Sequence, residues 1–330
     1  MNILVTGGSG FIGTRLVSEL LAAGHQVAIF DVAGSSAHPA FYVRGDVRDV
    51  QALMAATAGR DAIIHLAAEH RDDPESAALA ETVNVGGARN VVTAARAAGC
   101  GRILFTSSVA VYPLDVPGVA EEDPPRPYNR YGQTKLQAEQ VLGEWARSTA
   151  ASSLTLVRAC VVFGEGNRGN VYNLLRQIHR RRFVMVGSGH NRKSMAYVGN
   201  VTRFLGVCLS FPPGIHLYNY ADKPDLTVAE LVRLAQRELL RDTAAPRLRL
   251  PYWAGLLGGL GLDVLSRVSG QPSGISAIRI RKFCAETTVS TLRLDQLGFV
   301  RPYELAQALL QTIRYEFKSD GNQSTPDRCQ

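Results

Sequence analysis

Paired cysteines are what this sequence of 330 residues most plainly lacks. Its cysteines are odd in number, far apart and without a CxxC pair: Cys100, Cys160, Cys208, Cys284 and Cys329. That spacing excludes the disulfide framework of a small secreted protein and offers no zinc pattern. The seven histidines form no HxxxH pair, so no metal site is predicted. A reducing, cytoplasmic compartment is expected.

Long apolar runs are also missing. The most apolar stretch, residues 250–265, contains four glycines and Asp263 and is shorter than the ~20 residues that a spanning helix needs. We therefore expect no transmembrane segment. The stretch packs on the protein's own core or lies against a membrane surface. Residues 2–6 already have the pattern of a strand, which leaves no room for a signal peptide.

Charge is not concentrated in any one segment. The chain has 36 Lys and Arg against 29 Asp and Glu, a formal net charge of +7, spread along its length. A small phosphorylated ligand accounts for this excess as well as a nucleic acid does. The basic run at Arg176 and residues 179–182 fits a solvated helix end, and no nucleic-acid module accompanies it. No nucleic-acid partner is predicted.

Short apolar runs alternate with helical patterns through the first half of the chain. Strands are expected near residues 2–6, 26–30, 41–44, 62–66, 102–106 and 154–158, and helices near 11–23, 81–98 and 129–148. This alternation predicts right-handed crossovers and a parallel sheet covered on both faces, a doubly wound α/β (Rossmann) fold.

The regular alternation ends after residue 158. We predict a dinucleotide-binding domain over residues 1–160, with segments near 196–220 returning to it. A smaller, interleaved C-terminal substrate lobe is predicted over residues 161–317, with helices near 171–182, 227–240 and 303–317. Residues 318–330 are polar and without periodicity, which predicts a loose tail.

The most specific motif is TGGSGFIG at residues 6–13, directly after the first strand and at the start of the first helix. Its glycines permit a tight turn and let the backbone approach a pyrophosphate at the helix N-terminus. The predicted cofactor contacts are Gly7, Gly10, Phe11, Ile12 and Gly13. Asp31 ends the second strand, where a carboxylate binds ribose hydroxyls and repels a 2'-phosphate, so NAD is favoured over NADP. Asp46 either caps the following helix or, with Val47, contacts the adenine.

A tyrosine and a lysine lie one helical turn apart, at Tyr131 and Lys135, at the start of a predicted helix. A phenol is a weak base near neutral pH, and an adjacent cation favours its phenolate. Ser107 and Ser108 follow the fifth strand at the same edge of the sheet. A hydroxyl there can hydrogen-bond the reacting oxygen of an alcohol or ketone.

Together these motifs resemble the extended short-chain dehydrogenase/reductase superfamily, and within it the NAD-dependent epimerase/dehydratase family. The matching segments are TGGSGFIG at 6–13, Asp31, GDV at 45–47, HLAA at 65–68, NVGGARN at 84–90, TSSVAVY at 106–112 and YGQTK at 131–135. The resemblance implies that Ser108, Tyr131 and Lys135 form the catalytic triad. It also implies cofactor contacts by Asp46, Val47, Leu66, Ala67, Ala68, Asn84, Tyr131 and Lys135.

The dehydratases of this family have Thr-Asp-Glu where this chain has Ser108, Val109 and Ala110, so the acid and base for removing water are missing. Val161 replaces an asparagine typical of the 4-epimerases. The resemblance implies substrate contacts by Ser108 and Asn170, and places Lys193 and Arg279 or Arg281 near a diphosphate.

Three classes of function are compatible with these residues. The first is an NAD-dependent nucleotide-sugar epimerase that acts through a transient 4-keto sugar in polysaccharide or sugar-nucleotide biosynthesis. The second is a net oxidoreductase that reduces a 4-keto nucleotide sugar or oxidises a sterol-like alcohol. The third, a cofactor-binding protein without activity, is disfavoured by the intact Ser108, Tyr131 and Lys135. The expected partners are a nucleotide-diphosphate sugar and a second copy of the chain in a homodimer.

Overall fold

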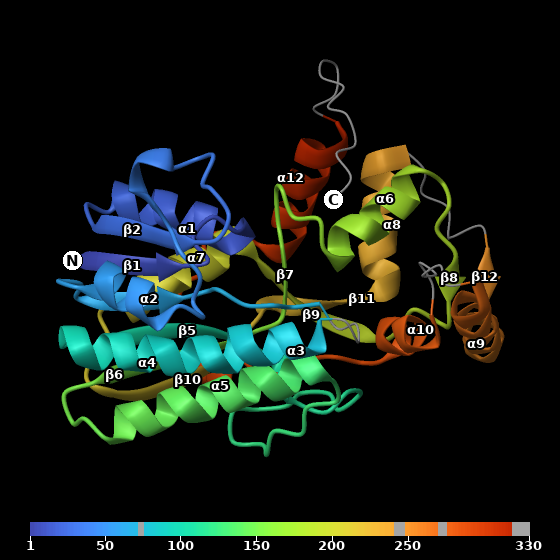
Figure 1. Cartoon of the computed structure of the whole chain (residues 1–330). Coiled ribbons are helices and arrows are strands. Elements are labelled where there is room, and N and C mark those ends of the chain that lie inside the picture. Colours follow the sequence, from blue (N-terminus) through green and yellow to red (C-terminus); the bar gives the residue numbers. More distant parts are fainter. Residues whose placement is uncertain (72–75, 241–247, 270–275, 319–330) are drawn as a thin grey trace.

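A parallel sheet of seven strands forms the larger part of the protein (Figure 1). The computed structural model describes residues 1–71, 76–240, 248–269 and 276–318, with the backbone alone for 264–269. The strand order is β10-β6-β5-β4-β1-β2-β3. The strands are β1 (Asn2–Thr6), β2 (Gln26–Asp31), β3 (Tyr42–Arg44), β4 (Ala62–His65), β5 (Arg102–Ser108), β6 (Ser153–Ala159) and β10 (Gly214–Tyr220). The order reverses beside β1, which opens the ligand crevice of a doubly wound sheet and confirms the predicted fold class.

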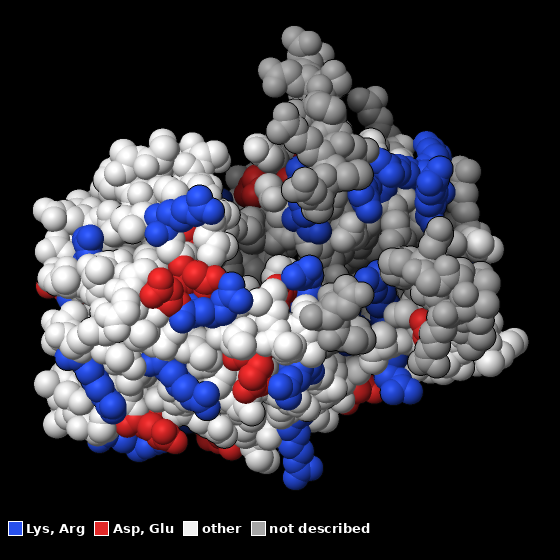
Figure 2. Space-filling view, in the orientation of Figure 1, with Lys and Arg blue, Asp and Glu red and all other residues white. Residues whose placement is uncertain are grey.

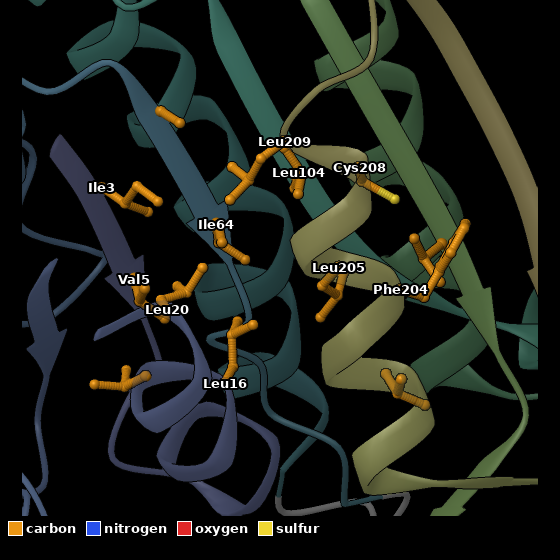
Figure 3. Close-up of a cluster of buried hydrophobic side chains, with 14 of the residues drawn as sticks. Ile3, Val5, Leu16, Leu20, Ile64, Leu104, Phe204, Leu205, Cys208 and Leu209 are labelled. Carbon is orange, nitrogen blue, oxygen red and sulfur yellow. The ribbon is translucent and has the colours of Figure 1, made fainter. Parts of the chain in front are cut away.

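Helices cover both faces of this sheet because the strand residues are apolar on both sides. Within β1, Ile3 and Val5 belong to one buried cluster and Leu4 to the other. The first cluster includes side chains of α1 (Phe11–Ala22) and α7 (Val198–Cys208), as Figure 3 shows for Leu16, Leu20, Phe204 and Leu205. The second cluster lies under α2 (Val50–Thr57), α4 (Gly87–Ala98) and α5 (Arg130–Arg147).

Two elements differ from the prediction in their bounds. The helix that was expected after the third strand, without bounds, is α2; it is eight residues long and is capped by Asp49, whose side chain accepts hydrogen bonds from the backbone of Gln51 and Ala52. The predicted helix at 81–98 starts earlier, as α3 (Ala77–Ala80), and continues through a π-helical turn, η2 (Glu81–Gly86), into α4. Two short 3-10 turns also occur, η1 (Pro39–Phe41) and η3 (Val109–Val111).

The second lobe contains two small sheets and most of the remaining helices. One sheet has the order β11-β9-β7 and the other pairs β12 with β8. Its strands are β7 (Val161–Phe163), β8 (Met185–Val186), β9 (Arg192–Tyr197), β11 (Asp222–Thr227) and β12 (Arg249–Leu250). Its helices are α6 (Asn170–His179), α8 (Val228–Leu240), α9 (Tyr252–Ser269), α10 (Ala277–Cys284) and α12 (Leu305–Phe317), while α11 (Leu292–Gln296) packs beside β10. The domain boundaries at 160 and 317 stay predictions, and all of the predicted tail after Lys318 lies outside the described residues.

The two lobes are joined by a cluster around Tyr197 at the end of β9. Arg15 of α1 donates to the Tyr197 hydroxyl at 3.0 Å and lies 3.6 Å from a carboxylate oxygen of Glu165. The Tyr197 backbone N–H donates to Asp222 at 2.6 Å. The C-terminal edge of the large sheet therefore faces the second lobe.

The charged side chains are distributed much as the sequence suggests. Across the visible face over the large sheet, Lys and Arg alternate with Asp and Glu, and Lys and Arg gather near α6 (Figure 2). Among the described residues, none of the helices combines the length and apolar character that crossing a bilayer requires.

Candidate active site

The loop between β1 and α1 is shaped for close approach of a ligand. Gly7 has a φ of 71°, and a Cβ there would lie 2.6 Å from the backbone nitrogen of Ala67. A Cβ on Gly13 would lie 2.5 Å from the Gly7 carbonyl oxygen. No side chain caps α1 at Gly10, so its first N–H groups face the loop. The loop presents backbone donors and the positive end of a helix dipole to an anion.

Asp31 connects this loop to the end of β2. Its carboxylate accepts from the backbone N–H of Ser9 and from that of Ala33, each at 3.0 Å. The Ser9 hydroxyl oxygen is buried without a hydrogen-bond partner in the described structure. A narrow glycine cradle, an unsatisfied hydroxyl and a carboxylate at the adjacent strand end together fit the pyrophosphate and ribose of NAD.

The segment after β3 shows which aspartate caps the following helix, a question that the sequence left open. Asp49, not Asp46, caps α2. Asp46 instead accepts from the Arg48 side chain, with Nη2 to Oδ2 at 2.5 Å, and this hydrogen bond lowers the pKa of the Asp46 carboxyl. Val47 is buried beside Gly87. Contact of Asp46 and Val47 with the adenine stays a prediction.

The residues after β4 lie against the glycine loop. Leu66 donates its backbone N–H to the Thr6 carbonyl at 3.0 Å, and Ala67 lies against Gly7. The buried Asn84 holds the next turn, since its amide accepts from Glu69 N and donates to Glu69 O, both at 2.9 Å. It also donates to the Thr134 hydroxyl at 2.9 Å. Asn84 thus fixes the 66–69 segment to α5, and its direct contact with cofactor stays a prediction, as does that of Ala68.

Close packing brings Tyr131 to Ser108. Asn129 caps α5 by accepting from Gly132 N at 2.9 Å. A Cβ on Gly132 would lie 2.1 Å from the Ala110 carbonyl oxygen, so only glycine lets the start of α5 meet the turn after β5. Burial raises the pKa of the Tyr131 phenol to about 12, and a hydrogen bond with Ser108 opposes this rise. The expected phenolate is therefore not favoured by these side chains alone.

Lys135 is buried one turn farther along α5. Its ammonium lies 4.0 Å from the centroid of the Phe105 ring, a cation–π contact. Burial lowers the pKa of Lys135 to about 7, and the negative charge of Glu139 opposes that shift. The buried amine therefore loses its proton far more readily than an exposed lysine does.

A buried ionic network that the sequence analysis missed lies beside this lysine. Glu139 accepts from Arg158 of β6, and the Ser107 hydroxyl donates to the same carboxylate. Arg158 also donates to the Tyr112 hydroxyl at 2.7 Å, which in turn donates to Asn219 at 2.9 Å. The i, i+4 spacing of Lys135 and Glu139 was the available signal. Ser107 is thus part of this network, and Ser108 faces Tyr131.

His65 is structural in this arrangement. Its ring is fully buried, stacks on Phe105 with centroids 5.4 Å apart, and lies 2.7 Å from the Thr6 hydroxyl. Burial, with a smaller contribution from the charge of Lys135, lowers the pKa of His65 to about 3. No group of three potential metal ligands occurs among the described residues.

The predicted substrate residues are only partly brought together. A pocket of about 290 Å³ in the second lobe is lined by Asp115, Val186, Gly187, Ser188, Asn191, Tyr252, Arg281, Cys284 and Ala285. Lys193 lies beside it, but its ammonium donates to the carbonyls of Lys282 at 2.8 Å and Ala285 at 2.5 Å. Burial lowers the pKa of Lys193 to about 8. Arg279 is exposed on α10, while Asn170 begins α6 and is not among the lining residues.

Known proteins resemble this chain in sequence and in fold. The model of the NAD dependent epimerase/dehydratase family matches residues 3–219. The chain is 46% identical over 318 residues to the Escherichia coli O157:H7 enzyme N-acetyl-alpha-D-glucosaminyl-diphospho-ditrans,octacis-undecaprenol 4-epimerase, covering 96% of this chain and 95% of that protein. It is 33% identical to a 2-alkyl-3-oxoalkanoate reductase of Stenotrophomonas maltophilia, over 75% of this chain and 77% of that one. A solved structure of MoeE5 with UDP-glucuronic acid and NAD superimposes with a TM-score of 0.77 at 26% identity, over 97% of this chain and 100% of that one.

Proposed function

The chain belongs to the NAD-dependent epimerase/dehydratase family of extended short-chain dehydrogenases/reductases, and from that premise we propose which sugar it acts on. It is an NAD-dependent sugar epimerase of the nucleotide-sugar 4-epimerase type. The proposed substrate is N-acetylglucosamine carried by a diphosphate on undecaprenol, inverted at C4 to the N-acetylgalactosamine epimer. The observation that carries this proposal is the 46% identity, over nearly the whole of both chains, to an enzyme named for that substrate.

The positions of Ser108 and Tyr131 account for the proton transfers. Held by the glycine loop and Asp31, NAD would supply the acceptor for a hydride from C4 and its donor to the opposite face of the ketone. The Tyr131 oxygen takes the proton of the C4 hydroxyl as the C4 ketone forms, and gives it back as the ketone is reduced. Ser108 hydrogen-bonds the same substrate oxygen and orients it. No atom is gained or lost over the cycle.

Lys135 supplies positive charge next to this chemistry. Its ammonium is held by burial against Phe105 and by the attraction of Glu139. When it is protonated, its charge stabilises a phenolate on Tyr131 relative to the neutral phenol. We propose that this charge lowers the pKa of Tyr131 in the working enzyme, against the effect of burial.

The diphosphate of the substrate is proposed to lie in the second lobe. Arg281 lines the pocket there, and the ammonium of Lys193 retains one of its three donors after its two carbonyl contacts. Cationic donors at a partly buried site offset the charge of two phosphates. Asn170 and Arg279 remain candidate substrate contacts.

We propose the compartment and the assembly that the sequence predicts, a reducing cytoplasm and a homodimer. The four cysteines within the described residues are all unpaired, which supports a reducing compartment such as the cytoplasm. A homodimer stays a prediction that light scattering of the purified protein tests.

The experiment offers both carriers to the purified enzyme. N-acetylglucosaminyl-diphospho-undecaprenol in detergent and UDP-N-acetylglucosamine in buffer are each incubated with the protein, and the sugar released by mild acid is identified by NMR. We expect N-acetylgalactosamine from the lipid-linked sugar, and none with Tyr131→Phe. Conversion of the nucleotide sugar alone would overturn the lipid carrier and leave a nucleotide-sugar epimerase.

A further inference from the structure

The helix α9 lies at the outer edge of the second lobe (Figure 1). One face of it is apolar and exposed. Trp253, Leu257 and Leu260 lie at i, i+4 and i+7, so they share one side of the helix. They are 66%, 61% and 49% exposed. No Asp, Glu, Lys or Arg occurs from Tyr252 to Leu262. The solvent-facing side of a helix is ordinarily polar, whereas the solvent-facing side of α9 is apolar.

The opposite side of α9 explains why the leucines face outward. Gly255 and Gly259 lie one turn apart on it, and a Cβ on Gly255 would lie 2.4 Å from the Val186 side chain. A Cβ on Gly259 would lie 2.8 Å from both the backbone nitrogen of Ala277 and the Ile280 side chain. Only the glycine side fits against β8 and α10, because any larger residue would overlap them. The close packing fixes the rotation of α9 and keeps Trp253 and Leu257 exposed.

The surface around this helix continues its apolar character and adds positive charge. Leu248 and Leu250, at β12, and Ile278, on α10, are 54%, 39% and 48% exposed. In the described segments 248–263 and 276–284 the charged residues are Arg249, Asp263, Arg279, Arg281 and Lys282. The single acid, Asp263, accepts from the Ala277 backbone at 3.0 Å. Exposed apolar side chains with the exposed Arg249 and Arg279 on neighbouring elements are complementary to the interface of a membrane with anionic lipid headgroups.

We propose that the outer face of α9, formed by Trp253, Leu257 and Leu260 with the neighbouring Leu250 of β12 and Ile278 of α10, docks on the surface of an anionic phospholipid bilayer. The helix lies in the plane of the interface, with Trp253 at the headgroup level and Arg249 and Arg279 facing the lipid phosphates. It enters the bilayer on one side only, since α10 and β8 cover its glycine side.

The position of the docking face suits the proposed lipid-linked substrate, and this point rests on the proposed function. Tyr252, the first residue of α9, and Arg281 both line the pocket of about 290 Å³ in the second lobe. That pocket therefore lies beside the docking face. A polyprenyl chain attached to a diphosphate in the pocket would leave it next to Trp253 and pass into the bilayer without crossing water.

Vesicle binding of the full-length chain tests the docking face directly. Sedimentation with vesicles of phosphatidylglycerol and phosphatidylethanolamine is compared with pure phosphatidylcholine vesicles. We expect binding to the anionic vesicles that weakens with salt. The exposed Trp253 reports insertion by a blue shift of its emission, while the buried Trp145 serves as an internal reference.

Two matched variants separate docking from general surface change. Leu257 on α9 and Leu292 on α11 are each 61% exposed. We expect Leu257→Glu to weaken vesicle binding by ~10-fold or more and Leu292→Glu to leave it unchanged. Equal loss in both variants, or absence of binding in the parent chain, would overturn the docking face. The docking face would also be overturned if the parent chain did not bind vesicles and instead formed a dimer that Leu257→Glu dissociates.

Activity measurements keep this inference apart from the proposed function. In detergent, Leu257→Glu should epimerise the lipid-linked sugar at the parent rate, and with the substrate embedded in vesicles it should be ~10-fold slower. Epimerisation in detergent without vesicle binding overturns docking and leaves the function. Vesicle binding without epimerisation of the lipid-linked sugar overturns the carrier and leaves the docking face.

Discussion

Glu139 binds Arg158 through a bidentate ion pair in the interior of the large domain. Nη2 of the arginine lies 2.7 Å from Oε2 of the carboxylate and Nε lies 3.0 Å from Oε1, with the side chains 6% and 5% exposed. Burial lowers the pKa of Arg158, but the hydrogen bonds and charge of Glu139 more than reverse this. The pair joins α5 to β6 next to Lys135.

Glu139→Gln should destabilise the protein strongly. It leaves the guanidinium of Arg158 buried without a counter-charge, which costs about 3–5 kcal/mol of unfolding free energy. Urea denaturation measures this loss. Glu144→Gln, on the exposed side of the same helix, is the control and should change stability by less than about 0.5 kcal/mol. Equal midpoints for the two variants would contradict the role given to the ion pair.

Tyr131→Phe should fold and bind NAD normally while turnover falls at least ~100-fold, because the proton acceptor is lost. Epimerisation assays and calorimetric NAD titration measure the two effects. Tyr315→Phe, at a tyrosine 58% exposed on α12, is the control. A Tyr131→Phe enzyme with a near-normal rate would remove the phenol from the mechanism.

Lys135→Met should abolish activity and yet stabilise the fold. The pKa of the buried amine is about 7, against an ordinary value of 10.5. Between these values the unfolded chain holds a proton that the folded chain lacks, so the free energy of unfolding rises with pH across that window. Below about pH 7 both states bind the proton, and the folded state bears the full free-energy cost of the buried charge. The substitution should raise the free energy of unfolding at pH 7 by roughly 1–4 kcal/mol.

Stability measured at pH 7 and pH 9 checks the lysine prediction. In the parent protein the free energy of unfolding should increase between these pH values, and in Lys135→Met this increase should shrink. A variant less stable than the parent at pH 7 would show that the packing of the lysine outweighs its desolvation.

Asp31→Ala should reduce discrimination between NAD and NADP. The parent should bind NAD(H) more tightly than NADP(H), because the carboxylate repels a 2'-phosphate. Calorimetry with each dinucleotide measures the ratio. Asp49→Ala removes a carboxylate that only caps α2, so it should lower stability without changing the preference. Tighter binding of NADP to the parent would exclude the ribose role of Asp31.

Arg281→Ala should raise KM for the sugar substrate and leave kcat and NAD affinity unchanged, because the arginine contributes equally to binding in the ground and transition states. Lys193→Ala should raise KM as well and should also lower Tm, since the carbonyls of Lys282 and Ala285 lose their donor. Arg203→Ala, exposed on α7, is the control for steady-state kinetics. An unchanged KM in Arg281→Ala would move the diphosphate elsewhere.

The fold and the cofactor loop were predictable because their signals are local. The glycine pattern follows β1 at once, and Tyr131 and Lys135 share one helical turn. Strands separated by helices admit few topologies, so the alternation predicted a parallel sheet, although not the order of its strands.

The remaining parts depend on contacts between distant residues. Glu139 contacts Arg158 because α5 packs against β6 in the folded protein. The sequence alone does not show which carboxylate pairs with this arginine. Lys193 was placed at a diphosphate, but where its ammonium points depends on the carbonyls at the end of α10, some 90 residues later. The short strands β7, β9 and β11 pair across long separations and have little alternation of their own.

The position of β10 has a consequence for synthesis of the protein. Every residue of β6 is buried in the finished sheet, with β5 on one side and β10 on the other. Yet β10 begins only at Gly214, on the order of 50 residues after β6 ends, which at about 5–20 residues per second is several seconds of translation. During that interval the outer edge of β6 is an open template for a strand of a neighbouring nascent chain. Co-translational crowding on one messenger RNA is therefore a specific hazard for this topology, and slowing elongation between residues 160 and 214 should increase aggregation.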